Sequence, residues 1–309
     1  MPVKGSVELR CIIPANCPVV PRITTIEDGG WTDRPAASSV THAEALERGD
    51  VLFLPNLRFE VTPSELKVFS PAVAAASKNV SFDPASGRLG GTALDGTDRT
   101  MLRDLIDRFS RQASALVRHM LPEYGGAIAA GRTSFRPVEI AGRASSWRKD
   151  DTRLHIDSFP ATPVHGRRIL RVFSNVNPQG RARSWRIGED FESVARRFST
   201  LLRMPPPGLD VVLGLLRVTK SRRTRYDALM LQLHDRMKAD TTYQAAVPQT
   251  PIDFPAGSTW MAFTDQVSHA AMSGQYQLEQ TFLVPVGAML DEQRSPLRIL
   301  ERLTGRSLI

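Results

Sequence analysis

The chain of 309 residues contains only two cysteines, Cys11 and Cys17. Two thiols are too few to staple a disulfide-rich scaffold, and they cannot complete a cysteine-based zinc site. They either form a single bridge or, as we expect, take no part in holding the fold together. This low cysteine content indicates a reducing compartment.

Long hydrophobic runs are also missing. The longest apolar stretch, residues 211–216, is far shorter than the roughly 20 residues that a helix needs to cross a bilayer. Residues 1–20 contain polar residues and prolines where a secretory signal would have an apolar core. These absences predict a cytoplasmic protein whose contact with the inner membrane, if any, is peripheral.

Acidic residues are in the minority, with 32 Asp and Glu against 40 Lys and Arg, and the net charge is +8. Such a balance favours an anionic partner, which could be nucleic acid, an anionic lipid surface or an acidic sugar. The basic residues do not cluster in one patch of the sequence. We therefore expect no nucleic acid partner.

The most informative motif that the sequence does contain is His155-Ile156-Asp157. In an extended strand, residues i and i+2 point to the same side, so the imidazole and the carboxylate would project together. Leu154 and Ile156 would then be buried on the opposite side. A histidine and a carboxylate placed in this way form two-thirds of the facial triad that holds non-haem Fe(II).

A second match to the pattern, His42-Ala43-Glu44, has a different context. It lies among helix-forming residues, and side chains two positions apart on a helix do not face one another. We therefore interpret His42 as part of a solvated helix end and not as a metal ligand.

His269 is the candidate for the third iron ligand. It follows a strand-like run at 259–263 and a polar turn, and it precedes another strand-like run at 276–286. This layout is typical of the distal histidine of a double-stranded β-helix oxygenase. The other histidines lie in predicted helices or turns, where we expect packing or surface roles: His42, His119, His165 and His234.

The rest of the chain predicts an α+β protein with a double-stranded β-helix core, of the jelly-roll or cupin-like type, and flanking helices. Residues 1–37 are rich in Pro, Thr and Gly and indicate an irregular N-terminal arm. Residues 38–309 would form a single oxygenase domain with a mainly helical insertion at about 178–250. Apolar residues at helical spacing predict a long helix from Thr97 to Leu121 that packs on the core.

Recognition of 2-oxoglutarate, the expected co-substrate of such an iron centre, needs a fixed cation for its distal carboxylate. Many similar oxygenases place this cation shortly after the distal histidine, where this chain has Glu279 and Gln280 instead. Arg171 is our first candidate and Arg136 the second, and for both an internal ion pair is the competing interpretation. Strand alternation puts Asn175 on the face of Arg171, and we count Asn175 and Gln280 among the candidate co-substrate contacts.

Longer stretches of the sequence resemble the Kdo hydroxylase family. The resemblance rests on residues 135–143, 146–160, 166–178, 268–269, 273–275 and 278–282. It implies an Fe(II)- and 2-oxoglutarate-dependent dioxygenase that hydroxylates 3-deoxy-D-manno-oct-2-ulosonic acid (Kdo) on a lipid A precursor of lipopolysaccharide. The product would be the 3-hydroxylated sugar Ko, with release of succinate and CO2. By the same resemblance, His155, Asp157 and His269 are the iron ligands.

Two other functions remain open from the sequence. An oxygenase of the same fold could act on another acidic substrate, and a non-catalytic basic module could bind anionic lipid or nucleic acid. Trp147, Trp185 and Tyr276 could stack on the faces of a sugar or pack in the core.

Overall fold

The computed structural model describes residues 21–33, 40–75, 79–206, 208, 214–216 and 218–309. Cys11, Cys17 and most of the expected N-terminal arm lie outside these residues, and so does part of the apolar stretch at 211–216. None of the helices within the described ranges combines the length and the apolar character needed to cross a bilayer.

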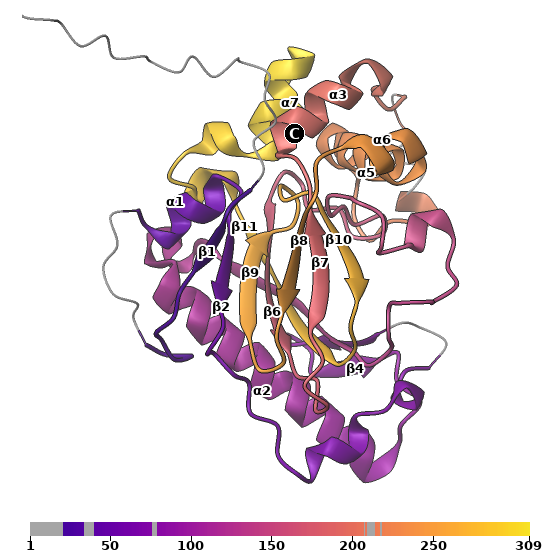
Figure 1. Ribbon diagram of the computed structural model, residues 1–309. Coiled ribbons are helices and arrows are strands. Elements are labelled where there is room, and N and C mark those ends of the chain that lie inside the picture. Colours follow the sequence, from indigo (N-terminus) through magenta and orange to yellow (C-terminus); the bar gives the residue numbers. More distant parts are fainter. Residues whose placement is uncertain (1–20, 34–39, 76–78, 207, 209–213, 217) are drawn as a thin grey trace, which may run out of the picture.

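Two β-sheets form the centre of the molecule (Figure 1). The larger sheet has the strand order β1-β2-β9-β6-β11-β5-β3-β4, and the smaller has the order β10-β7-β8. The strands are β1 (Ile23–Thr25), β2 (Val51–Leu54), β3 (Val80–Asp83), β4 (Arg88–Gly90), β5 (Ala129–Arg136), β6 (Arg168–Asn175), β7 (Arg183–Ile187), β8 (Thr250–Phe254), β9 (Thr259–Phe263), β10 (His269–Ser273) and β11 (Gln277–Val284). β1 and β2 are parallel, and the other paired strands are antiparallel, as in jelly rolls.

Helices flank the two sheets. They are α1 (His42–Glu47), α2 (Gly96–Met120), α3 (Phe191–Phe198), α5 (Arg225–Ala239), α6 (Thr241–Ala246) and α7 (Pro296–Thr304). Short 3-10 helices add η1 (Glu65–Val68), η2 (Pro71–Val73), η3 (Pro122–Ala127), η4 (Trp147–Lys149), η5 (Ser199–Leu201), η6 (Val286–Ala288) and η7 (Glu292–Arg294). The predicted long amphipathic helix is α2, whose Leu105 and Phe109 share an apolar cluster with Leu170 and Val172 of β6. α2 therefore covers the outer face of the larger sheet.

Aromatic side chains fill the space between the two sheets. Side chains alternate along β6, so Phe173 points away from α2 and toward the smaller sheet. The ring of Phe173 lies 5.1 Å from that of Trp185 in β7 and 5.3 Å from that of Trp260 in β9, between centroids. This shared layer joins the sheets and agrees with the predicted double-stranded β-helix.

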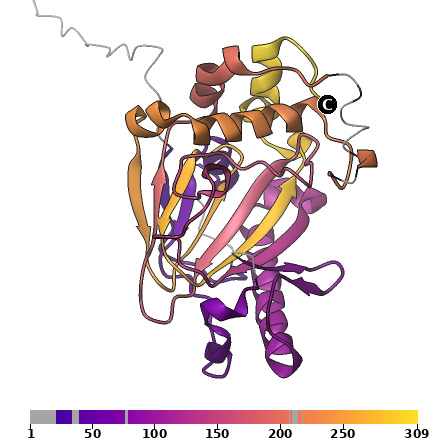
Figure 2. The ribbon, with the colours of Figure 1, turned by 90° about the vertical axis from the view of Figure 1, so that its right-hand side faces the viewer.

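A second group of helices lies at one end of the sheets (Figure 2). α3, α5, α6 and α7 contribute side chains to one apolar cluster, which also contains Leu154 and Ile156. Leu154 and Ile156 therefore pack into this cluster, and His155 points to the opposite side of its own segment.

Two expected boundaries differ in the structure. Ile23–Thr25, inside the expected irregular arm, forms strand β1 and pairs with β2. Strand β7 lies inside the range expected to be a helical insertion, because its alternating sequence buries Arg183, Trp185 and Ile187 and pairs with β8 and β10. The helices of the insertion begin only at Phe191.

Candidate metal centre

His155 and His269 lie directly opposite one another in an isolated antiparallel β-bridge. The backbone N–H of His155 donates to the carbonyl of His269 at 3.0 Å, and the N–H of His269 donates to the carbonyl of His155 at 2.9 Å. Leu154 and Ile156 are fully buried on the other side, as the alternation predicts. This reciprocal pair holds two side chains that are far apart in the sequence at a fixed spacing.

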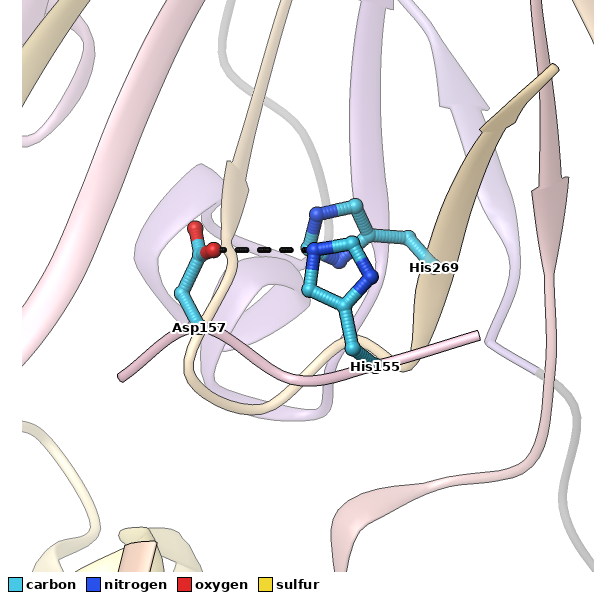
Figure 3. Close-up of side chains that lie close together, drawn as sticks. All are labelled: His155, Asp157 and His269. Atoms are coloured by element: carbon cyan, nitrogen blue, oxygen red, sulfur yellow. Dashed lines mark ion pairs between the residues drawn. The ribbon is translucent and has the colours of Figure 1, made fainter. Parts of the chain in front are cut away.

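Asp157 completes the group (Figure 3). Its backbone N–H donates to the carbonyl of Thr264 at 2.8 Å, which ties it to the turn that leads to His269. One ligand atom from each of His155, Asp157 and His269 lies within 4.8 Å of the other two. The structure therefore brings together the three side chains that the sequence predicted.

Hydrogen bonds orient both imidazole rings. Nδ1 of His155 lies 2.8 Å from the carbonyl oxygen of Arg153, and Nδ1 of His269 lies 2.8 Å from that of Val267. A carbonyl can only accept, so each Nδ1 carries the proton and each Nε2 keeps its lone pair. Partners of this kind fix the tautomer of metal-binding histidines.

Burial and neighbouring charges set the protonation of the group. Burial lowers the pKa of His155 well below its usual value, with a further contribution from His269, and burial also lowers the pKa of His269. Burial alone would raise the pKa of Asp157, but Arg171 and the two imidazoles hold it well below its usual range. At neutral pH the site thus offers two neutral imidazoles and one carboxylate, the state in which metals bind.

This donor set fits a divalent transition metal. Two imidazole nitrogens and one carboxylate suit Fe(II), and three protein ligands leave positions for other molecules. Oδ2 of Asp157 is buried and accepts no hydrogen bond from the residues that the structure describes. The other His-x-acid motif, His42-Ala43-Glu44, does not form such a group. Glu44 forms a capping box with Thr41 at the start of α1 and is not turned toward His42.

A cavity of about 350 Å³ lies beside the three side chains. Its volume falls in the range of small-molecule sites, roughly 300–1,000 Å³. The lining comes from the inner faces of both sheets, from helix α5 and from the loop that follows Asp157. Charged groups are frequent in it and include Arg136, Arg171, Arg183, Lys238 and Glu279.

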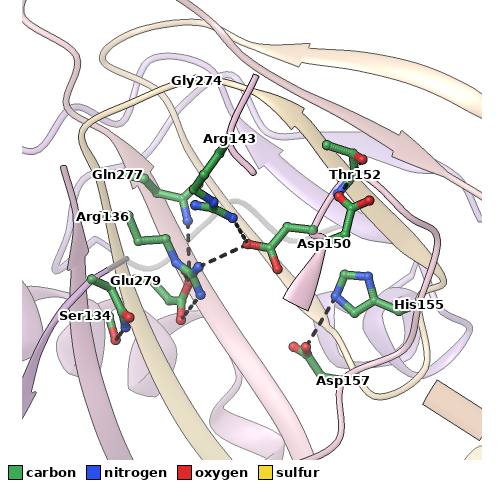
Figure 4. A network of polar contacts seen from close by, with 12 residues as sticks. Ser134, Arg136, Arg143, Asp150, Thr152, His155, Asp157, Gly274, Gln277 and Glu279 are labelled. Carbon is green, nitrogen blue, oxygen red and sulfur yellow. Dashed lines mark hydrogen bonds and ion pairs between the residues drawn. The ribbon is translucent and has the colours of Figure 1, made fainter. Parts of the chain in front are cut away.

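Glu279 accepts hydrogen bonds from two of these arginines, and Figure 4 shows its contact with Arg136. Arg136 donates to the Glu279 carboxylate from Nε at 2.8 Å and from Nη2 at 3.2 Å, and Arg171 donates from Nη1 at 3.1 Å. Nε of Arg171 also lies 3.3 Å from Oδ2 of Asp157. β11 lies between β5 and β6, which carry the two arginines. Arg136 and Arg171, the predicted 2-oxoglutarate contacts, thus form internal ion pairs, which was the alternative interpretation of both residues.

Arg183 of β7 is a cation that the sequence analysis missed. Its buried guanidinium donates from Nη1 to the carbonyl of Gly274 at 2.8 Å, while Nε has no hydrogen-bond partner. It forms no ion pair with any residue in the described ranges. Burial and repulsion from Arg136 lower the pKa of Arg183 to about 9. The alternation of Arg183 with Trp185 was the available signal, but it fell in the range assigned to helices.

Helix α5 brings two further polar side chains to the cavity. His234, predicted as a packing or surface residue, places its ring 5.5 Å from that of His155, between centroids. Lys238 is buried, and its Nζ donates to the carbonyl of Arg148 at 3.1 Å. Within the described part of the chain Lys238 has no ion pair. A helical pattern predicts that residues share a face, but it does not say what that face covers.

Two predicted co-substrate contacts lie elsewhere. Asn175 is buried, and its amide donates to two backbone carbonyls, both at 2.9 Å. Gln280 follows Glu279 on β11 and therefore points to the opposite face, where it accepts a hydrogen bond from Thr133 at 2.5 Å. The structure corrects both assignments, because each side chain already has its partners outside the cavity.

The three aromatic candidates take different places. Trp185 lines the cavity and stacks beside His269, with ring centroids 4.9 Å apart. Tyr276 packs in the core against Phe69 and Phe135. The guanidinium of Arg148 lies over the ring of Trp147 at 4.1 Å.

Comparisons with known proteins agree on one family. The sequence matches a family model described as 3-deoxy-D-manno-oct-2-ulosonic acid (Kdo) hydroxylase over residues 31–307. One similar crystal structure is the Kdo hydroxylase KdoO, a non-haem Fe(II) α-ketoglutarate-dependent dioxygenase, in complex with α-ketoglutarate and Fe(III). It is 45% identical, with 94% of this chain and 97% of that chain covered and a TM-score of 0.89.

Further structures of the same kind give the same picture. The apo structure of the Kdo hydroxylase KdoO and its complex with cobalt(II) are each 45% identical, with 93% of this chain and 97% of that chain covered and a TM-score of 0.90. The search of curated proteins found no match. The likeness to solved structures extends over nearly the whole chain and confirms the predicted fold.

Proposed function

The chain belongs to the Kdo hydroxylase family, and from this premise we infer which bond it oxidises and which residues hold the reactants. It is a non-haem Fe(II), 2-oxoglutarate-dependent dioxygenase. We propose that it hydroxylates C3 of a Kdo sugar on a lipid A precursor, at the cytoplasmic face of the inner membrane, to give Ko. The observation that carries this proposal is the His155, Asp157 and His269 group at the wall of a cation-rich cavity.

His155, Asp157 and His269 are the proposed Fe(II) ligands. When bound, Fe(II) supplies the chemistry by which oxygen and 2-oxoglutarate place one oxygen atom in a C–H bond and the other in succinate, with release of CO2. The chain's own residues supply the geometry. Carbonyl groups hold the two imidazoles, Arg171 holds the Asp157 carboxylate, and the Trp185 ring restricts His269.

The distal carboxylate of 2-oxoglutarate is proposed to bind at Arg183. Arg136, Arg143 and Arg171 pair with the carboxylates of Asp151, Asp157 and Glu279, and Arg148 pairs with Asp235. Arg183 also lines the cavity, but it has no ion pair within the described part of the chain. A dianionic co-substrate would supply the missing negative charge. Arg136 and Arg171, the predicted anchors, would flank the same carboxylate, and the buried Nε of Arg183 would gain an acceptor.

Lys238 is proposed to bind the carboxylate of the Kdo sugar. It approaches the cavity from helix α5, whereas Arg183 belongs to the sheet wall, so the two cations can serve different anions. Burial lowers the pKa of Lys238, and nearby acids oppose this effect without pairing directly. A carboxylate from the substrate would stabilise the ammonium group.

Arg183→Gln and Lys238→Gln should separate these two roles. Loss of a charge-assisted hydrogen bond costs about 1.5–3 kcal/mol, so Arg183→Gln should raise the Kd for 2-oxoglutarate about 10–100-fold. Lys238→Gln should leave that Kd unchanged and raise the KM for the Kdo acceptor. Anaerobic calorimetry of the Fe(II)-loaded protein measures the first quantity, and each variant is the control for the other. If both variants changed the same constant, the assignment of two separate anions would be wrong.

The reaction itself is tested on a Kdo-bearing lipid A precursor. With Fe(II), 2-oxoglutarate and labelled oxygen gas, we expect the product to gain one labelled oxygen atom, located at C3 by NMR, and one succinate to appear for each. A hydroxyl group at another carbon would contradict the C3 assignment. Succinate formed without any modified Kdo would favour another acidic substrate.

A further inference from the structure

The backbone that carries His155 is paired with a strand on one edge, through the bridge to His269. The backbone groups of His155 and the N–H of Asp157 all point to this edge. Successive residues of an extended segment turn these groups to opposite edges, so those of Leu154 point away from His269. The contacts of Leu154 therefore decide how the second edge of the ligand segment is held.

The side chain of Gln244 in α6 occupies this second edge. Its Oε1 accepts a hydrogen bond from the N–H of Leu154 at 2.8 Å, and its Nε2 donates to the carbonyl of Leu154 at 2.9 Å. Nε2 also donates to the carbonyl of Met237 in α5 at 2.8 Å. A primary amide has two N–H donors, and both are used here. Gln244 thus takes the place of a neighbouring strand, and helix α5 fixes the orientation of its amide.

One peptide plane connects Gln244 with the imidazole of His155. The carbonyl of Arg153 and the N–H of Leu154 belong to the same planar peptide unit and point in opposite directions. The N–H end donates to Gln244, and the carbonyl end accepts from Nδ1 of His155 at 2.8 Å. A rotation of this plane would move the acceptor that fixes the tautomer and the direction of the ring. The hydrogen bonds thus run from Gln244 to the imidazole through a rigid unit.

Burial makes these hydrogen bonds costly to lose. Leu154 is fully buried, and His155 is 7% exposed. A backbone N–H or carbonyl that loses its partner in such surroundings carries the full cost of desolvation, so the segment would shift to recover a partner. Arg153 adds a second tie to α5, because its Nη1 donates to the carbonyl of Lys238 at 2.8 Å. Without Gln244 the segment would keep this tie and the bridge, but it would be free to turn about them.

We propose that Gln244 is a positioning residue of the metal centre, which sets the orientation of the His155 ring through the peptide unit between Arg153 and Leu154. The inference rests on the proposed metal ligands and goes beyond the proposed function, since Gln244 does not line the cavity. The alternative is a glutamine that stabilises the fold and leaves metal binding unchanged.

Gln244→Met tests the proposal, because methionine has a similar length and forms no comparable hydrogen bonds. The Kd for Co(II) should rise about 10–100-fold, as is typical when a residue that orients a metal-binding histidine is lost. The visible absorption spectrum of bound Co(II) should also change, since it depends on the arrangement of the ligands. Both are measured on folded protein without 2-oxoglutarate or oxygen, so neither readout depends on turnover.

Gln232 of α5 provides a matched control. Its Oε1 accepts from the N–H of Arg203 at 2.9 Å, and its Nε2 donates to the carbonyl of Arg203 at 2.8 Å, the same pair of bonds that Gln244 makes with Leu154. Both glutamines are half-buried, but Arg203 adjoins none of the metal ligands. Gln232→Met should lower the free energy of unfolding, measured by chemical denaturation, while its Kd for Co(II) and its spectrum stay those of wild type.

A folded Gln244→Met protein with the wild-type Kd and spectrum would overturn the proposal, and so would equal losses of affinity in both variants. If Gln244→Met does not fold, Gln244→Asn, whose side chain is one methylene shorter, is measured in the same way with the same expectation. If wild type bound no Co(II), the proposed metal centre would be wrong and the inference would fall with it. If wild type bound Co(II) but hydroxylated no Kdo acceptor, the proposed substrate would be wrong and the role of Gln244 would stand.

Discussion

Replacement of His155 by alanine should abolish tight Fe(II) binding and reduce hydroxylation below detection. The change removes one of three metal donors from a buried site, and no other described histidine or carboxylate is held by the same bridge to His269. Loss of a mere partner of a metal ligand already costs about 10–100-fold in affinity or activity, so loss of the ligand itself should cost more. Anaerobic titration with Fe(II) or Co(II), followed by oxygen consumption, measures both effects.

His42→Ala is the matched control for this variant. His42 belongs to the other His-x-acid pair, but α1 holds Glu44 in a capping box and the metal group lies elsewhere. Metal affinity and turnover should therefore be those of wild type. A His155→Ala protein that is folded and still binds one Fe(II) with wild-type affinity would refute the proposed centre.

The second large effect is expected at Asp265, in the turn before His269. Its carboxylate accepts hydrogen bonds from Nε and Nη2 of Arg168 at 2.8 and 3.3 Å, and both side chains are almost fully buried. Asp265→Ala would leave the Arg168 guanidinium buried without a counter-charge. Breaking a buried ion pair in this way lowers the free energy of unfolding by about 3–5 kcal/mol. Chemical denaturation measures the change.

Two comparison variants give this prediction its meaning. Asp104→Ala removes an exposed ion pair with Arg103 and should change the free energy of unfolding by about 1 kcal/mol or less. The double variant Arg168→Met/Asp265→Leu removes both buried charges. Its free energy of unfolding should be far closer to that of wild type than the value for Asp265→Ala. If the double variant were as unstable as the single one, lost packing and not the unpaired charge would be the cause.

The metal group was predictable because its signals are local. Alternation around His155 places Leu154 and Ile156 opposite the ligands, and turn and strand patterns isolate His269 from the other histidines. Pairing across the sheet depends on residues far apart in the sequence. The sequence showed that Glu279 stands where similar oxygenases have a cation. It left open whether Arg136 and Arg171 bind the co-substrate or form internal ion pairs. β11 lies between β5 and β6 and so brings the Glu279 carboxylate to both arginines.

The missed residues share a physical reason. Arg183 belongs to a five-residue strand between β6 and α3, and such a short alternating pattern is a weak signal, so this strand was included in the expected helical insertion. His234 was placed on a helix, but amphipathicity does not identify the neighbouring element, and Lys238 was not singled out. Asn175 was placed on the inward face, yet backbone carbonyls use its amide, and such a competition is visible only in three dimensions.

The reciprocal backbone bridge between His155 and His269 has a consequence for how this family can vary. It joins the two ends of the long segment between these residues, which contains β6 to β9 and the insertion helices. The entropy of closing such a loop grows only slowly with its length. This segment can therefore lengthen, shorten or change its exposed side chains while His155 and His269 at its two ends keep their spacing. Evolution could thus refit the enzyme to a different membrane or acceptor without rebuilding its metal centre.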